Sequence, residues 1–454
     1  MIQRFKKTIT ILFLLMIPLF AQEKKTLTIE QALQIGLENS KALRTSQFKV
    51  DVADARSSEM NTLRLPSLKF NGTYTRLSAV DPTVIPFPMS GIVDNDPYPG
   101  HVSLIPTMYQ FGANLVNSYG LKATIQQPLY TGGKISGAAN AAEYLSDATK
   151  EDYKKDKADV LYNIKAAYWN FFRANEFKRF VDENVNQIKS HAKDAENLMK
   201  QGMLTSNDLM KVQVQLSDAL VRQIDATNNV KLAMYALNNT LGLPLQTDIE
   251  LISTIQISDR TWENVDTLVG KAFEKRPEVL GMNARVKAGE SGLTSARGGW
   301  WPQIYLIGNY NYMRPNPRIF PTVDQFDKTW DVTLSLSFDI WNWWQTGYQA
   351  NQAQAQLAQA QEGLSMMKDG VMLEVTQSYL GVNQFKERKA VAEQGVQQAE
   401  ENYRVTDDKY KIGMTSNSEL LDAEVALLQA RLNLTQSLVD YALSMARLSR
   451  AIGE

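Results

Sequence analysis

Apolar and polar residues alternate with a period of two in four short segments of this sequence. In the clearest segment, every even position from Trp330 to Ile340 is apolar and every odd position from Asp331 to Asp339 is polar. This alternation predicts strands that have one apolar face and one polar face. Four strands are predicted, over residues 67–76, 119–130, 303–313 and 329–341.

Longer segments repeat their apolar residues at the spacing of a helix. Positions three and four apart are mostly apolar or small from Leu209 to Leu237, and again from Leu420 to Leu448, which is typical of a coiled-coil seam. A helix of about 68 residues spans about 100 Å, roughly the length of two helices of about 36 residues in series. Six helices are predicted, over residues 29–64, 134–201, 206–241, 263–298, 345–412 and 417–451.

The sequence contains the same order of elements twice. At an offset of 211 residues, GMLTSNDLMKVQV from Gly202 matches GMTSNSELLDAEV from Gly413, and upstream, at an offset of 236, Pro66 matches Pro302. The offsets differ because the first copy contains an insertion, whose Pro/Gly-rich segment AVDPTVIPFPMSGIVDNDPYPG predicts a loop. We therefore predict a first repeat at 22–244 with an extracellular loop at 77–118, a linker at 245–262, and a second repeat at 263–454 with a loop at 314–328.

Residues 1–21 have the layout of a secretory signal peptide. A basic start is followed by an apolar run from Ile9 to Phe20 and by the small residue Ala21. The run is too short to cross a bilayer as a helix, and we find no other stretch of the sequence that is apolar enough to do so. Lipid cannot form hydrogen bonds with the backbone, so a spanning segment must pair all its polar backbone groups within a helix or a closed β-sheet. Without a membrane-spanning helix, entry into a membrane would require β-structure.

The predicted strands have the length of tilted outer-membrane strands, but small membrane barrels begin at about eight strands. Because open sheet edges are not tolerated in lipid, several chains must each contribute four strands to one barrel. Trp330, Trp341, Trp343 and Trp344 are predicted to form an interfacial girdle at the membrane boundary. The alternation leaves one alternative open, a strand pair on a soluble core with one face in water.

Composition excludes several kinds of chemistry. Cysteine is absent, which rules out disulfides, thiolate zinc sites, a thiol nucleophile and a lipid-bearing cysteine. The two histidines, His101 and His191, do not have the paired spacing of metal ligands. A formal net charge of −1 gives no reason to expect a nucleic acid partner. Because the sequence has neither a phosphate-binding loop motif nor a G-x-S-x-G nucleophile motif, we predict no enzyme and no bound cofactor or metal.

These features together resemble the TolC-like outer-membrane efflux protein family, the outer membrane factors, over nearly all of the mature sequence. The resemblance rests on the duplication and on the phrases QPLYTGGK (127–134), LGLP (241–244) and KRPEV (275–279). It implies a mainly α fold with membrane β-structure, in which a trimeric twelve-stranded β-barrel is continuous with a long α-helical periplasmic barrel. It also implies a homotrimer in outer-membrane lipid that extends into the periplasm and docks a periplasmic membrane-fusion adaptor and an inner-membrane pump.

The duplicated phrase lies at the turn after each long helix. Gly202 and Gly413 suit a left-handed helix end, and Thr205 is predicted to cap the following helix. Glu419 and Asp422 lie near the start of the last helix. If three chains converge on one axis, these two residues would form an acidic constriction that favours cations; the alternative is an ordinary solvated helix start.

The resemblance also implies how such a tip is closed, through a tyrosine, an acid and a basic residue. Tyr410 and Asp208 match the first two positions, whereas Thr415 occupies the basic one. An ionic lock is therefore not expected, and only a hydrogen bond from Tyr410 to Asp208 is carried over.

The function that these observations favour is a passive outer-membrane exit duct of a tripartite efflux or secretion system, including type I secretion, which opens at its periplasmic tip. The alternative from another class is a soluble periplasmic coiled-coil scaffold or adaptor. The two differ in whether the protein requires detergent.

Overall fold

The computed structural model describes residues 25–79, 83–91, 103–111, 115–252, 260–320 and 322–454. The predicted signal peptide, residues 1–21, lies outside these ranges. The chain divides into two compact units, one formed by residues 1–48, 152–279 and 367–454, and the other by residues 49–151 and 280–366.

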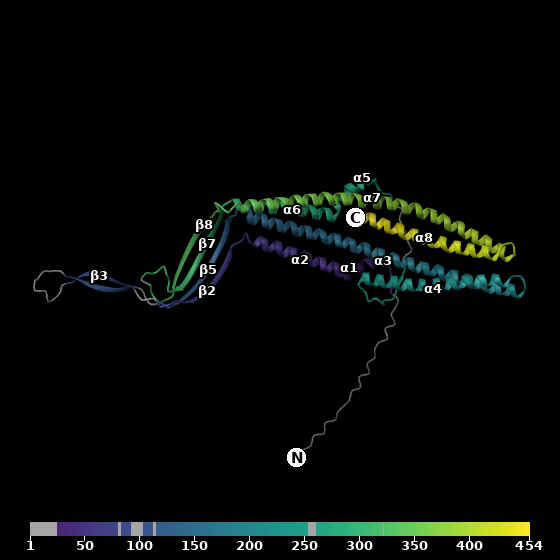
Figure 1. Cartoon of the computed structure of the whole chain (residues 1–454), viewed down its shortest axis with the longest axis horizontal. Helices are drawn as coiled ribbons and strands as arrows, with labels where there is room; N and C mark the ends of the chain where they lie inside the picture. The colour runs from purple at the N-terminus through teal and green to yellow at the C-terminus, as the bar shows by residue number, and fades with distance from the viewer. Residues whose placement is uncertain (1–24, 80–82, 92–102, 112–114, 253–259, 321) are drawn as a thin grey trace, which may run out of the picture. The chain divides into compact units, whose positions relative to one another are not determined.

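The second unit contains an antiparallel four-stranded sheet with the order β2-β5-β7-β8 (Figure 1). Its strands are β2 (Ser67–Arg76), β5 (Asn117–Tyr130), β7 (Gln303–Arg314) and β8 (Asp327–Ser337). All four predicted strands are therefore present, but the prediction that the last one extends to residue 341 is wrong. β8 ends at Ser337, which pairs with Gln303, the first residue of β7, so β7 has no residue left to pair with the positions that follow.

Alternation along the strands gives this sheet one apolar and one polar face. Leu68, Ile125, Gly308 and Val332 are aligned across the four strands, and the adjacent apolar side chain of Leu334 is 68% exposed. On the other face Thr124 Oγ1 donates to Asn309 at 2.9 Å, and Asn309 Nδ2 donates to Asp331 at 2.7 Å. The apolar face of a single chain therefore lies open, while the polar face is joined across strands by hydrogen bonds.

The inserted segment of the first copy forms a hairpin, which corrects the prediction that residues 77–118 are only loop. Strand β3 (Thr83–Gly91) pairs with β4 (Ser103–Phe111) in antiparallel register. Its prolines, Pro86, Pro88 and Pro106, had indicated a loop. A two-stranded hairpin accepts them because each strand has an unpaired side, where the missing N–H group costs no ladder bond.

The long helices confirm the helical part of the prediction. Helices α3 (Lys134–Lys200) and α7 (Gln345–Lys411) have 67 residues each, and they are followed by α4 (Ser206–Leu241) and α8 (Asn417–Ala451). Positions of both predicted seams are buried, among them Val212, Ala219, Ala226, Leu237, Ala423, Ser437, Tyr441 and Leu448. None of the helices in the described part of the chain has both the length and the hydropathy needed to span a bilayer.

The predicted helices 29–64 and 263–298 are each broken in two. Helix α1 (Ile29–Asn39) is followed by α2 (Lys41–Thr62), and α5 (Val265–Lys275) by α6 (Pro277–Arg297) and a short 3-10 turn, η1 (Gly298–Trp300). Ser40 and Arg276, at the two breaks, are extended. Pro277 disfavours the helical conformation of the residue before it, and Ser40 Oγ accepts the Leu43 N–H at 3.1 Å, which starts a new helix.

The closing helix of each copy ends against the break in the same way. Gly242, at the end of α4, and Gly453, after α8, have φ values of +68° and +78°. A Cβ atom on Gly242 would lie 2.8 Å from Asn39, and one on Gly453 would lie 3.0 Å from Lys275, the counterpart of Asn39. The joint is therefore duplicated together with the sequence, and its close contact leaves no room for a side chain.

Different chemistry holds the two joints. The first contains an apolar cluster that includes Leu27, Ile164, Tyr168, Phe171, Leu237, Leu241 and Ile249. Leu27 and Ile249 belong to β1 (Lys25–Leu27) and β6 (Ile249–Leu251), a short parallel pair that the sequence did not predict and that places β6 within the predicted linker. The Tyr168 hydroxyl donates to the Leu27 carbonyl oxygen at 3.1 Å.

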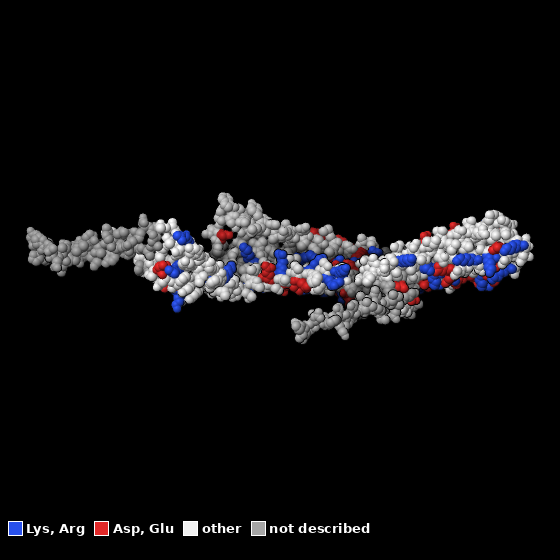
Figure 2. Space-filling model, turned by 90° about the horizontal axis from the view of Figure 1, so that it is seen from below, with Lys and Arg blue, Asp and Glu red and all other residues white. Residues whose placement is uncertain are grey.

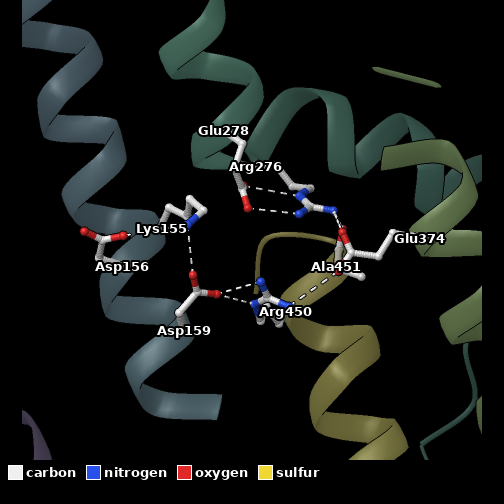
Figure 3. Close-up of polar contacts among 8 residues, drawn as sticks. All are labelled: Lys155, Asp156, Asp159, Arg276, Glu278, Glu374, Arg450 and Ala451. Atoms are coloured by element: carbon white, nitrogen blue, oxygen red, sulfur yellow. Dashed lines mark hydrogen bonds and ion pairs between the residues drawn. The ribbon is translucent and has the colours of Figure 1, made fainter. Parts of the chain in front are cut away.

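The second joint is held by partly buried ion pairs around the buried Arg276 (Figure 3). Arg276, whose side chain is 5% exposed, binds both oxygens of Glu278, at 2.9 and 3.3 Å, and reaches Glu374 on α7 at 2.6 Å. Arg450 on α8 binds Asp159 on α3 at 2.6 Å. Burial acts to raise the pKa of Glu278, but its bonds with Arg276 outweigh that effect and hold the pKa below its ordinary value.

Candidate functional site

The turns that end α3 and α7 lie at the same end of their unit (Figure 1). Gly202 and Gly413 both have φ +74°. The amide N–H groups of Met203 and Met414 donate to the carbonyl oxygens of Leu198 at 2.9 Å and Lys409 at 2.8 Å, a bond typical of the Schellman helix end. The left-handed glycine conformation that the sequence predicted is therefore present at both turns.

The helices that leave these turns are capped by hydroxyl side chains. Thr205 Oγ1 accepts the Asp208 N–H at 3.2 Å, which confirms the predicted cap, and Ser416 Oγ accepts the Glu419 N–H at 3.3 Å. Thr205 Oγ1 also donates to the Asp208 carboxylate at 2.6 Å, and Lys211 Nζ lies 3.7 Å from it. The Thr205 bond is the main reason that the pKa of Asp208 lies below its ordinary value.

The predicted hydrogen bond from Tyr410 to Asp208 is not formed. The Tyr410 hydroxyl is buried and has no hydrogen-bond partner among the described residues. Burial raises its pKa, and the charges of Asp194 and Asp208 add to the effect. The Asp208 carboxylate is instead bound by Thr205, while the Tyr410 ring packs against His191 with centroids 5.0 Å apart.

Thr415 bonds with one of the two predicted constriction residues of its own chain. The Thr415 hydroxyl donates to the Glu419 carboxylate four residues later. Glu419 and Asp422 are both exposed. A ring of these acids requires further copies of the chain, so the acidic constriction stays a prediction.

Both helix turns line one open cavity of about 1100 Å³. Its charged lining includes four carboxylates and two lysines from both hairpins, namely Asp194, Asp208, Asp407, Glu424, Lys211 and Lys411. Two further lining residues, His191 and Asn417, are buried and hydrogen-bonded to each other. The sequence did not predict these two residues or Glu424 as site residues. The only feature that could have pointed to them is a polar residue at a position next to the apolar seam.

The predicted girdle residues occupy two places at the sheet. Trp330 lies on β8, whereas Trp341, Trp343 and Trp344 lie in the turn before α7. All four are more than 60% exposed, and Trp341 packs edge-on against Trp343 with ring centroids 5.7 Å apart. Two further tryptophans, Trp300 and Trp301, are also exposed just before β7; the sequence did not predict them as girdle residues because they fall beyond the end of a helix pattern.

Trp343 and Trp344 have left-handed backbone conformations, with φ of +52° and +62°. At the offset of 211 residues they match Gly132 and Gly133, with φ of +60° and +90°. The second copy thus places large side chains where the first has glycine, although a left-handed residue other than glycine costs about 1–2 kcal/mol.

Replacing Trp343 by glycine is expected to stabilise the protein by about 1 kcal/mol or less, because relief of the left-handed strain exceeds the entropy cost of glycine in the unfolded chain. The measurement is the thermal midpoint of the far-UV circular dichroism signal in detergent. A Cβ on the matching Gly132 would lie only 2.4 Å from Trp301, so the control is Gly133→Ala at the next left-handed position, where the nearest neighbour, Thr294 Cγ2, would lie 3.5 Å from the new Cβ. Gly133→Ala should lower the thermal midpoint. If Trp343→Gly also lowers it, the left-handed backbone of Trp343 is not a source of strain.

Three comparisons relate this chain to known proteins. A family model described as "Outer membrane efflux protein" matches residues 32–243 and 268–454, one segment in each repeat. The outer membrane protein TolC of Vibrio cholerae is 21% identical over 315 residues, which cover 69% of this chain and 72% of that protein. The probable efflux pump outer membrane protein TtgC of Pseudomonas putida is 19% identical over 433 residues, which cover 94% of this chain and 82% of that protein.

Solved structures share the fold at low sequence identity. The outer-membrane channel OprN aligns with a TM-score of 0.75 at 16% identity, over 94% of this chain and 89% of that one. The CmeC outer membrane channel of Campylobacter jejuni also aligns with a TM-score of 0.75 at 16% identity, over 94% of this chain and 85% of that one.

The duplicated helices and the strand pairs therefore define the fold class of the solved outer-membrane channels. The chain belongs to the outer membrane efflux protein family. Its relatives are outer-membrane channel proteins and not enzymes, which favours the channel over the soluble periplasmic scaffold.

Proposed function

We propose that this protein is the homotrimeric exit duct of a tripartite efflux or secretion system. The duct is passive: a periplasmic membrane-fusion adaptor connects it to an inner-membrane pump, and the pump supplies the energy. The family is described as outer membrane efflux proteins, and the relative TtgC as a probable efflux pump outer membrane protein, which supports these two partners.

The observation that carries the trimer is the open sheet. Within the described residues, β2 and β8 each pair on one side only, and the apolar side chains of β8 are exposed along its length. An open edge beside an apolar face is not stable in lipid. Three copies joined edge to edge would close a barrel of twelve strands, whose apolar faces contact the membrane and whose polar faces line the pore.

The other predicted sites have their place in this trimer. Trp330, Trp341, Trp343 and Trp344 would lie at the membrane boundary, where indole rings are favoured. The turns at Gly202 and Gly413 would form the periplasmic gate. Glu419 and Asp422 of three chains would surround the axis and favour the passage of cations.

On the face in Figure 2, acidic and basic side chains are interspersed along the helices without a large area of one sign. A nucleic acid would require a clustered basic surface.

Purified protein in detergent is expected to contain three chains per particle, measured by light scattering coupled to size exclusion and by native mass spectrometry. In planar bilayers the same particles should give discrete conductance steps. A variant with Leu334 and Leu336 both replaced by glutamate is the control, because charges on a lipid-facing strand are costly. It should lose insertion. A monomer that stays soluble without detergent would exclude the proposed duct.

A further inference from the structure

The geometry points to His191 and Asn417 as a latch that holds the two tip hairpins of one chain together and keeps the gate closed. This inference rests on the proposed duct and identifies gating residues other than the expected Tyr410 and Asp208.

Asn417 connects three helices at the tip. It is the first residue of α8 and is buried, with 6% of its surface exposed. Its Oδ1 accepts a hydrogen bond from His191 Nε2 on α3, and its Nδ2 donates to the Asp208 carbonyl oxygen on α4 at 3.4 Å. One amide side chain of the second hairpin is thus bound to both helices of the first.

The Tyr410 ring strengthens this contact from the remaining helix. Tyr410 lies on α7, and its ring plane is inclined at 64° to that of His191, with the ring centroids 5.0 Å apart. Aromatic pairs favour this edge-to-face arrangement. The Tyr410 hydroxyl makes no hydrogen bond with a described residue. Tyr410 therefore acts through its ring, and removal of its hydroxyl should not open the gate.

Asn417 is not needed to start its own helix. Ser416 already caps α8 by accepting the Glu419 N–H at 3.3 Å. A buried amide that does not cap the helix lowers the free energy only while its hydrogen bonds are formed, because a buried unpaired polar group is unfavourable. Separation of the hairpins would leave Asn417 and His191 without these partners unless water entered.

The duplication shows that the latch occurs at one of two related positions. At the offset of 211 residues, the counterpart of Asn417 is Ser206 and that of His191 is Asn402, and both are exposed. In a trimer these counterparts would face one another between neighbouring chains. The latch therefore joins hairpins within a chain, and opening would begin at the contacts between chains.

The test is single-channel recording of the full-length protein in planar bilayers. Asn417→Ser, which introduces the residue of the first copy, removes both bonds and should raise the open probability at least about fivefold, since a single net hydrogen bond corresponds to about that factor. Tyr410→Phe is the matched control and should behave like the wild type. An unchanged open probability in Asn417→Ser, with trimers intact, would overturn the latch while leaving the duct unaffected.

A second variant tests the latch in the opposite direction. The chain has no cysteine, so His191→Cys combined with Asn417→Cys provides a single pair that can be oxidised across the same contact. Oxidation should keep the channel closed, and a reducing agent should restore opening. A cross-linked channel that still opens like the wild type would also overturn the latch. Absence of conductance in the wild type would instead reject the duct itself.

Discussion

Replacing Arg276 by alanine is expected to lower the free energy of unfolding by about 3–5 kcal/mol, because removal of one partner leaves buried charges uncompensated. Arg276 lies between Glu278 and Glu374, bonded to both, and also reaches the Ala451 carbonyl oxygen at 3.5 Å (Figure 3). The substitution would leave the partly buried carboxylate of Glu278 without its arginine and that of Glu374 with only the 3.5 Å contact to Arg450. It would also release the break between α5 and α6 from the helices α7 and α8.

The pH dependence of this loss has a definite sign. The bonds with Arg276 hold the pKa of Glu278 below its ordinary value of 4.5 despite burial. The stabilisation is therefore fully present above pH 4.5 and disappears as the pH falls through the lower, native-state pKa. The difference between the wild type and Arg276→Ala should be largest near neutral pH and smaller in acid.

Thermal unfolding of the detergent-solubilised protein, followed by circular dichroism at the helical minimum, measures this effect. Arg404→Ala is the matched control, because Arg404 also pairs with two acids, Glu401 and Asp408, but is exposed. Its thermal midpoint should stay close to that of the wild type, since exposed ion pairs contribute little. Equal midpoints for the two variants would show that the buried network does not stabilise the joint.

The sequence was sufficient for the repeated elements because their patterns are long. Strands of about ten alternating residues and seams of several heptads give a strong periodic signal, and the duplication supplies a second, independent copy of each. The same reasoning failed at short features. β1 and β6 have three residues each, too few for a period to be visible.

The helix breaks show which local signals carry weight. Pro277 marks the second break, since proline restricts the residue before it; in our prediction the helical periodicity outweighed this signal. No proline accompanies Ser40, and the apolar pattern continues across it. That break depends on a serine cap and on the contact between Asn39 and Gly242, which only the folded chain brings together.

At the tip, residue type predicted the backbone but not the side-chain contacts. Gly202, Gly413 and Thr205 adopt their expected conformations because these are local preferences. The bond between Tyr410 and Asp208 depended on side chains more than 200 positions apart, whose distance is set by helix packing. Asn417 became a candidate only when the structure placed it beside His191.

Replacing Glu424 by glutamine is expected to stabilise the protein by about 3 kcal/mol at pH 8.5 and to have little effect near pH 4.5. Glu424, on α8, is 3% exposed, and its Oε2 has no hydrogen-bond partner among the described residues. Burial, with a smaller contribution from the charge of Asp407, raises its pKa from 4.5 to about 7. Because the native state resists ionisation of Glu424, its destabilising effect is absent below pH 4.5, grows as the pH rises and is complete above pH 7.

The groups around Glu424 do not neutralise its charge. On α7 its charge interacts with Tyr403 and Asp407, and Asn184 on α3 lines the same small cavity. The nearby Arg431 is already bound to Glu183 at 3.2 Å and Glu400 at 2.9 Å. Glutamine has the same shape without the charge, and it is the residue that the first copy has at the matching position, Gln213.

Thermal midpoints of wild type and Glu424→Gln in detergent, measured from pH 4.5 to pH 8.5, give the comparison. The two curves should nearly coincide at pH 4.5 and separate progressively up to about pH 7, with the variant the more stable. Glu196→Gln on α3 is the control, because Glu196 is bonded to Lys200 at 2.7 Å and its pKa is lowered by that bond. It should show no stabilisation at alkaline pH. A constant difference between the midpoints of Glu424→Gln and wild type at every pH would contradict this prediction. It would mean that the Glu424 carboxyl does not titrate in this range and that its ionisation does not destabilise the protein.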